Sequence, residues 1–188
     1  SAMATTGMAY DSGSATISVT DSFDADALRA VLLEGFQNCN TKIDISAFKI
    51  SSTSENLQLI FGIIDEQLPE CFHVSNVVLW SQTDKFITVE ASYLATKSEY
   101  EVMLSNLIST KNKLLQGIKG NNSLGDVEKA LLIHDRLALI CEYDYNKTSH
   151  RHDIYGALVN GAAVCQGYAV AYDYLLEEVG IPGYICTS

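Results

Sequence analysis

Cys165 is the residue whose position best suits chemistry, because it opens a predicted helix. The run Val164-Cys165-Gln166-Gly167 comes just before an apolar helical pattern that continues to Leu176. Unpaired N–H groups and the positive dipole end at a helix start favour the thiolate, the nucleophilic form of cysteine. The N–H groups of Gln166 and Gly167 could also donate to the oxyanion that forms when sulfur attacks a carbonyl.

The residues around Cys165 are small, which suits an approaching substrate. Gly161-Ala162-Ala163 precedes it and Gly167 follows, and small residues leave room for a peptide and for close packing of the helix on a sheet. A buried structural cysteine beside a tightly packed helix is the alternative interpretation.

Tyr168 and Tyr172 share a helix face with Cys165, so they either line a cleft or pack in the core.

Four further cysteines lack a helix-start setting, and we expect them to be inert packing residues. The sequence has five cysteines and no Cys-x-x-Cys pair, which argues against a zinc site and a thioredoxin-type redox pair. If one is a reactive thiol, the other four are either reduced or joined in two disulfides, with three connectivities open. These four are Cys39, Cys71, Cys141 and Cys186.

Histidines that could act as a base occur just upstream of Cys165. His150 and His152 lie in a polar loop and could in principle approach the thiol. A loop rich in Asp, Asn, Ser and Thr is typical of solvated side chains, and this is what we expect for both. His134 is predicted to be a hydrogen-bonded core residue on its helix, and His73 a structural residue on a strand.

The charge balance limits the kinds of partner. The chain has 12 Lys and Arg residues against 23 Asp and Glu, a net charge of -11, which would repel a phosphate backbone. We therefore expect no nucleic-acid partner. No apolar run reaches the roughly 20 residues that span a bilayer, so no membrane span is expected. The N-terminus has neither the basic region nor the apolar core of a signal peptide.

The composition favours a folded α+β protein. With 188 residues, of which 47% are hydrophobic, the chain can build a core, and we expect neither a metal nor a cofactor. Apolar periodicity predicts helices near 25–36, 55–67, 98–115, 126–141 and 165–179, a strand at 42–50, and a hairpin of 72–80 with 86–94.

The sequence also predicts where the helices begin and end. The expected N-caps are Asp24 or Ser22, Ser54, and Ser123 or Asp126. Gly180 is expected to end the last helix with a Schellman motif, followed by a strand at 183–186. On the helix at 126–141, the residues predicted to face inward are Val127, Leu131, Leu132, His134, Ala138 and Cys141.

One segment resembles a known family. Residues 155–169 read Tyr-Gly-Ala-Leu-Val-Asn-Gly-Ala-Ala-Val-Cys-Gln-Gly-Tyr-Ala and are followed by Leu175 and Gly180-Ile181-Pro182. This pattern resembles the nucleophile segment of the bacterial transglutaminase-like family of papain-like cysteine enzymes. The helix containing Ile133-His134-Asp135-Arg136-Leu137, with Tyr143-Asp144 after it, resembles the preceding helix of that family.

The resemblance implies a papain-like core that is truncated after the nucleophile helix and the next strand. The expected regions are 4–122, an N-terminal α/β subdomain of helices and a hairpin, and 123–188, the nucleophile half of the core. In the family, a His and an Asp on later strands complete a triad with the cysteine. The chain ends at Ser188, before those strands, so it is expected to be inactive alone. It is also expected to form a homo-oligomer, either through the unpaired edge near Cys186 or through an exchanged element.

The resemblance further implies an acyl-transfer enzyme that acts on amide bonds of peptides or proteins. Hydrolysis and transamidation share a thioester intermediate, so both reactions remain open. The alternative is a non-catalytic module on the same scaffold that binds a protein or a cell-wall peptide. A bacterial extracellular or cell-surface location is favoured.

Overall fold

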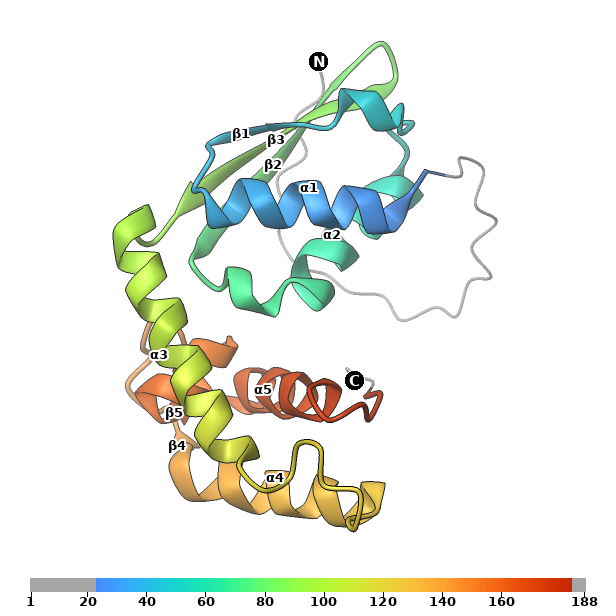
Figure 1. Ribbon diagram of the computed structural model, residues 1–188. Helices are drawn as coiled ribbons and strands as arrows, with labels where there is room; N and C mark the ends of the chain where they lie inside the picture. The colour runs from blue at the N-terminus through green and yellow to red at the C-terminus, as the bar shows by residue number, and fades with distance from the viewer. Residues whose placement is uncertain (1–22, 184–188) are drawn as a thin grey trace. The chain divides into compact units, whose positions relative to one another are not determined.

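The computed structural model describes residues 23–183, which contain both helices and strands in an α+β arrangement (Figure 1). The chain forms two compact units that divide between Tyr100 and Glu101. This division lies upstream of the expected boundary at 122–123. The reason is that the first turn of one long helix packs with the N-terminal unit through Tyr100, which is 1% exposed. We call the parts unit 1 and unit 2.

Unit 1 is a three-stranded antiparallel sheet covered on one face by two helices. The strands β1 (Lys42–Asp44), β2 (Val74–Gln82) and β3 (Lys85–Tyr93) lie in the order β1-β3-β2. The predicted hairpin is confirmed, and it turns through Thr83 and Asp84, whose φ angles of 51° and 59° fit a two-residue turn. Short 3-10 turns occur at Ser46–Phe48 (η1) and Pro69–Cys71 (η2).

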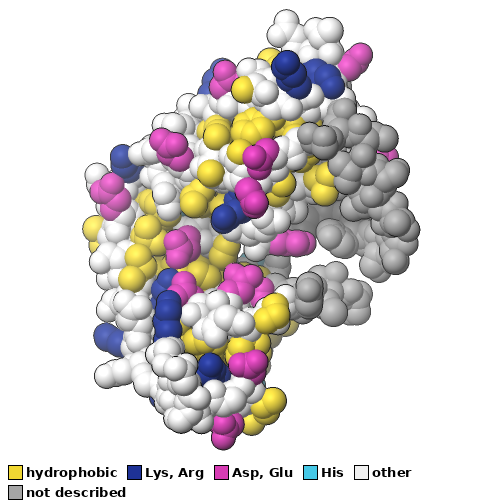
Figure 2. Space-filling model, turned by 45° about the vertical axis from the view of Figure 1, so that its right-hand side comes forward, with side chains coloured by type: hydrophobic (Ala, Val, Ile, Leu, Met, Phe, Trp, Pro, Cys, Tyr) yellow, Lys and Arg dark blue, Asp and Glu magenta, His cyan; other side chains and the backbone are white. Residues whose placement is uncertain are grey.

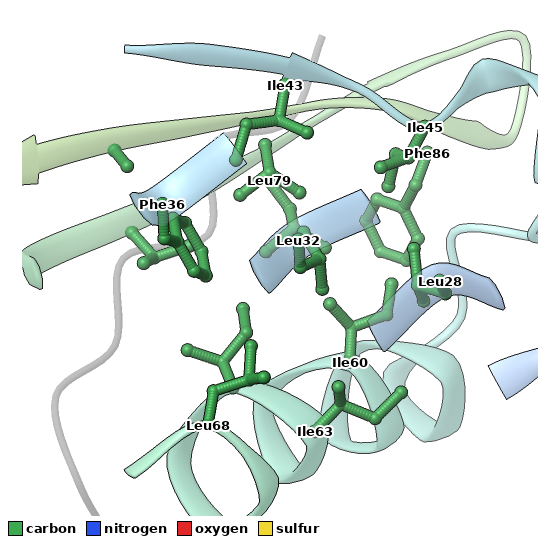
Figure 3. Close-up of a cluster of buried hydrophobic side chains, with 14 of the residues drawn as sticks. Leu28, Leu32, Phe36, Ile43, Ile45, Ile60, Ile63, Leu68, Leu79 and Phe86 are labelled. Carbon is green, nitrogen blue, oxygen red and sulfur yellow. The ribbon is translucent and has the colours of Figure 1, made fainter. Parts of the chain in front are cut away.

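The core of unit 1 lies between the sheet and the helices α1 (Ala25–Gln37) and α2 (Ser54–Gln67) (Figure 3). Apolar residues spaced by three or four along each helix point toward the strands, as the periodicity predicts. The fully buried side chains include Leu28, Leu32, Phe36, Ile45, Ile60 and Val89.

Two predictions for unit 1 are wrong in detail. The strand expected at 42–50 ends at Asp44, because the Asp44 carboxylate accepts the Ser46 N–H at 2.8 Å and the chain then turns through η1. The N-cap of α2 is Thr53 and not Ser54, since Thr53 Oγ1 accepts the Asn56 N–H at 3.3 Å.

The predicted cap of α1 is confirmed, and it supports a stability test. Asp24 Oδ1 accepts the Ala27 N–H at 2.9 Å, whereas Ser22 lies outside the described residues. Asp24→Ala is expected to lower the free energy of unfolding of unit 1 by about 1 kcal/mol. Urea titration followed by the fluorescence of Trp80, the single tryptophan, measures this change. Asp26→Ala is the control and should cost only a few tenths of a kcal/mol; an equal loss in both variants would contradict the capping role.

Unit 2 is built from three helices and a short parallel strand pair. The helices are α3 (Lys97–Leu115), whose first turn belongs to unit 1, α4 (Asp126–Ile140) and α5 (Cys165–Glu177). The strands β4 (Glu142–Tyr143) and β5 (Ala162–Ala163) pair in parallel, and a π-helical turn, η3 (Gly156–Asn160), precedes β5. The end of α5 follows the prediction, with Gly180 at φ 79° and Ile181 N–H donating to Leu176 O at 3.0 Å. Of the strand expected at 183–186, residues 184–186 lie outside the described residues.

The predictions for the start and the inner face of α4 are wrong. Its N-cap is Gly125, whose N–H donates to Glu128 Oε2 at 2.8 Å, while Ser123 bonds to Asn121 instead. The buried residues are Ile133 and Leu137, whereas Val127 is 73% exposed. Apolar residues occur all around this helix, so periodicity could not select the buried side. Of the residues predicted to face inward, Leu131, Leu132, His134 and Ala138 are also exposed.

Charged side chains of both signs occur on the face of the molecule that Figure 2 draws. On the face drawn in Figure 2, Asp and Glu side chains are spread over the molecule, with Lys and Arg side chains among them. Among the helices of residues 23–183, none has the length and apolar character that a membrane crossing requires.

Candidate active site

Cys165 is the first residue of α5, as the sequence predicts, and it is exposed. Val164 before it is extended, with φ -88° and ψ 178°, and no side chain caps the helix. The Tyr168 N–H makes the first bond of the helical ladder, to Val164 O at 3.0 Å. The N–H groups of Cys165, Gln166 and Gly167 precede that bond, so they are the donors available beside the thiol.

The carbonyl of Arg151 holds the first turn of α5 in place. It accepts the Val164 N–H at 2.9 Å. It also lies so close to Gly167 that an added Cβ would be 2.5 Å from this oxygen and 3.1 Å from the Ala163 Cβ. Only glycine fits at position 167 without displacing backbone atoms. The loop before the nucleophile segment therefore fixes where α5 begins.

His152, in the preceding loop, packs against the first turn of α5 beside Gln166. Its Nδ1 is 3.2 Å from Gln166 Oε1, and Arg151 Nε donates to its Nε2 at 2.8 Å. Since Gln166 Oε1 can only accept, Nδ1 carries the proton and Nε2 supplies the lone pair that Arg151 uses. The side chain is exposed, as predicted, but both ring nitrogens are occupied, so this arrangement does not present His152 as a base for Cys165.

His150 is nearly buried, contrary to the prediction of a solvated side chain. Its exposed fraction is 8%, and its Nδ1 is 2.7 Å from Asp153 Oδ2. The other oxygen of Asp153 accepts the N–H groups of Tyr155 and Gly156 at 2.9 and 3.1 Å. Asp153 therefore links His150 to the start of η3, a role that no sequence pattern around this carboxylate indicates.

Tyr168 and Tyr172 pack toward α4. The His134 ring is steeply inclined to both phenol rings, at 71° and 85°, with centroid distances of 6.3 and 6.0 Å. Tyr172 OH donates to Ala130 O at 3.1 Å. Burial raises the pKa of both phenols. His134 itself is half exposed and contacts Asp135, so the prediction that it is a core histidine is wrong.

The described cysteines are reduced thiols in contrasting surroundings. Cys165 is exposed, Cys39 and Cys141 are intermediate, and Cys71 is buried. Burial, with a smaller effect of the Glu70 charge, raises the pKa of Cys71 to about 12. Burial also raises the pKa of Cys141. Cys186 lies outside the described residues.

This contrast predicts an order of alkylation. With limiting iodoacetamide at pH 8, Cys165 should be labelled first and Cys71 last, because the raised pKa keeps the Cys71 thiol protonated at that pH. Below its pKa, each unit of pH should raise the labelling rate of Cys71 about tenfold. Peptide mapping by mass spectrometry gives the order. Labelling of Cys39 or Cys141 ahead of Cys165 would count against the assignment of Cys165 as the reactive thiol.

Within residues 23–183, no three His, Cys, Asp or Glu side chains gather as ligands for a metal ion.

No protein-family model matches the sequence, and no curated protein matches it either.

Proposed function

We propose that Cys165 is the nucleophile of an acyl-transfer enzyme of the transglutaminase-like, papain-like type, acting on amide bonds of peptides or proteins. The observation that supports the proposal is an exposed thiol on the first residue of a 13-residue helix whose first turn is held by backbone contacts. A structural cysteine would be expected in the core, as Cys71 is.

The proposed reaction uses sulfur and two backbone donors. The Cys165 thiolate attacks the carbonyl carbon, and the N–H groups of Gln166 and Gly167 donate to the resulting oxyanion. Collapse of this intermediate breaks the C–N bond, leaves a thioester on sulfur and releases an amine, which takes up a proton. Water or a second amine then cleaves the thioester.

The proton transfers need a base that the contacts of the described histidines do not supply. His152 has both ring nitrogens engaged, and His150 is nearly buried against Asp153. The family resemblance assigns this role to a histidine on a strand that follows the nucleophile helix, with an aspartate that orients it.

An activated ester tests the nucleophile separately from the base. In p-nitrophenyl acetate the leaving p-nitrophenolate needs no proton, so acylation depends on the thiolate and the oxyanion donors alone. We expect one acetyl group per chain on Cys165, with an equal amount of p-nitrophenolate released. Mass spectrometry locates the acetyl group, and absorbance follows the release.

Matched variants make the result specific. Cys165→Ala should abolish the rapid acylation, while Cys39→Ala and Cys141→Ala should leave it unchanged. Acylation of Cys165 no faster than that of Cys39 would overturn the proposal and favour a non-catalytic module that binds a protein or a cell-wall peptide.

A further inference from the structure

His73 is a fully buried histidine with one ring nitrogen that lacks a partner. It lies between η2 and β2 and is 0% exposed. Its Nε2 is 2.9 Å from Phe36 O in the last turn of α1. A carbonyl can only accept, so Nε2 carries the proton and Nδ1 has a lone pair. Among the atoms of the described residues, Nδ1 has no hydrogen-bond partner.

The His73 ring is stacked between two tyrosines. Its centroid is 3.6 Å from that of Tyr100 and 5.3 Å from that of Tyr93, and both ring planes are within 20° of its own. The tyrosines are fixed at their far ends, because Tyr100 OH donates to Glu70 O and Tyr93 OH donates to Asn40 O. The stack therefore attaches the first turn of α3 to η2, β3 and the end of α1.

This site suits a neutral imidazole only. A second proton would give Nδ1 an N–H group with no acceptor and would bury a positive charge. The groups near the stack include the phenols of Tyr93 and Tyr100 and the thiol of Cys71, whose pKa values burial raises, so they are neutral near pH 6. The thiol of Cys39 also lies near both phenols. The charged group beside the stack is Glu70, which acts on Tyr100 and Cys71. Lys97, on the first turn of α3, is bonded to Asn38.

The direction of the pH effect follows from linkage. Burial lowers the pKa of His73, and the hydrogen bond to Phe36 O opposes this only partly. An opened form, in which the ring meets water, therefore binds more protons than the closed form once the pH falls below about 6.5. The closed form is fully favoured above that pH and is progressively lost below it.

We propose that His73 is a pH-sensitive latch: the neutral ring holds the first turn of α3 on unit 1, and the protonated ring releases it. The proton enters from solvent and binds to Nδ1. Because α3 continues directly into unit 2, the latch acts on the helix that connects the units along the chain. This inference is independent of the proposed reaction at Cys165.

Hydrogen exchange on the whole chain tests the latch. We compare pH 7.5 with pH 5.5, correct for the intrinsic pH dependence of exchange, and follow the amides of residues 100–103, the first of which donates to Thr96 O at 2.9 Å. These amides should exchange faster at pH 5.5 in the wild type, by up to about tenfold. In His73→Gln, whose amide can still donate to Phe36 O but cannot be protonated, the acceleration should disappear.

His134→Gln is the matched control, because it removes an exposed histidine and should keep the acceleration. An equal pH response in wild type and His73→Gln, or none in the wild type, would overturn the proposal. If His73→Gln does not fold, nitrogen NMR of the wild-type ring gives a second test. The Nε2–H tautomer should persist below pH 6.5, and a titration like that of an exposed histidine would overturn the latch.

Discussion

Alanine at position 167 is expected to lower the free energy of unfolding of unit 2 by about 3 kcal/mol and to slow acylation of Cys165 at least tenfold. The added methyl group would lie 2.5 Å from the Arg151 carbonyl oxygen, and a backbone atom cannot move aside as a side chain does. The first turn of α5 would have to shift, and the N–H donors beside the thiol would shift with it. Far-ultraviolet circular dichroism during denaturation and the p-nitrophenyl acetate assay measure the two effects.

Gly62→Ala is the matched control for this prediction. Gly62 lies inside α2, and a Cβ added there would meet nothing within 4 Å. Alanine favours the helix more than glycine does, so this variant should raise the free energy of unfolding by about 0.5–1 kcal/mol. It should leave the acylation of Cys165 unchanged. A Gly167→Ala protein with wild-type stability and wild-type acylation would show that the contact with Arg151 does not position Cys165.

Leu32→Ala should have the other large effect, a loss of about 3 kcal/mol in the free energy of unfolding of unit 1. Leu32 is fully buried at the centre of the cluster between α1, α2 and the sheet (Figure 3), and truncation leaves a cavity that the packed neighbours fill only in part. Trp80 fluorescence during urea titration reports the change.

Leu94→Ala provides the comparison, because the same atoms are removed from a side chain that is 53% exposed. In that variant the free energy of unfolding of unit 1 should fall by less than about 1 kcal/mol. Equal losses in the two variants would mean that the cluster around Leu32 is not the core that stabilises unit 1.

The sequence predicted those elements for which several local signals agree. The hairpin has two β-rich runs separated by a polar turn, and α1 has both an apolar stripe and the cap at Asp24. The inner face of α4 was not predictable, because apolar residues on all sides leave the buried side to be chosen by tertiary packing. The prediction of a strand over 42–50 was wrong, because the Asp44 carboxylate accepts the Ser46 N–H and the backbone then turns into η1.

The candidate site could be predicted only as far as its local signals extend. Cys165 immediately precedes a clear helical pattern, so its position at a helix start could be predicted from the sequence. The contact of Gly167 with the Arg151 carbonyl and the pairing of His150 with Asp153 depend on how the preceding loop folds back. A polar loop has no periodicity that reveals such contacts, and its composition suggested solvated histidines instead.

Because of the π-helical turn η3, the position of Cys165 depends on the number of residues before it as much as on their types. The turn closes with Gly161 N–H donating to Gly156 O, and the Gly161 carbonyl then accepts the Glu142 N–H at 2.9 Å. Deleting one residue there would convert the wide turn to ordinary helical pitch and rotate everything after it by about 100°. The pairing of β5 with β4 would be lost, and Val164 would no longer reach the Arg151 carbonyl. A substitution in this segment therefore changes only one side chain and its contacts. An insertion or a deletion would change the position of Cys165 itself.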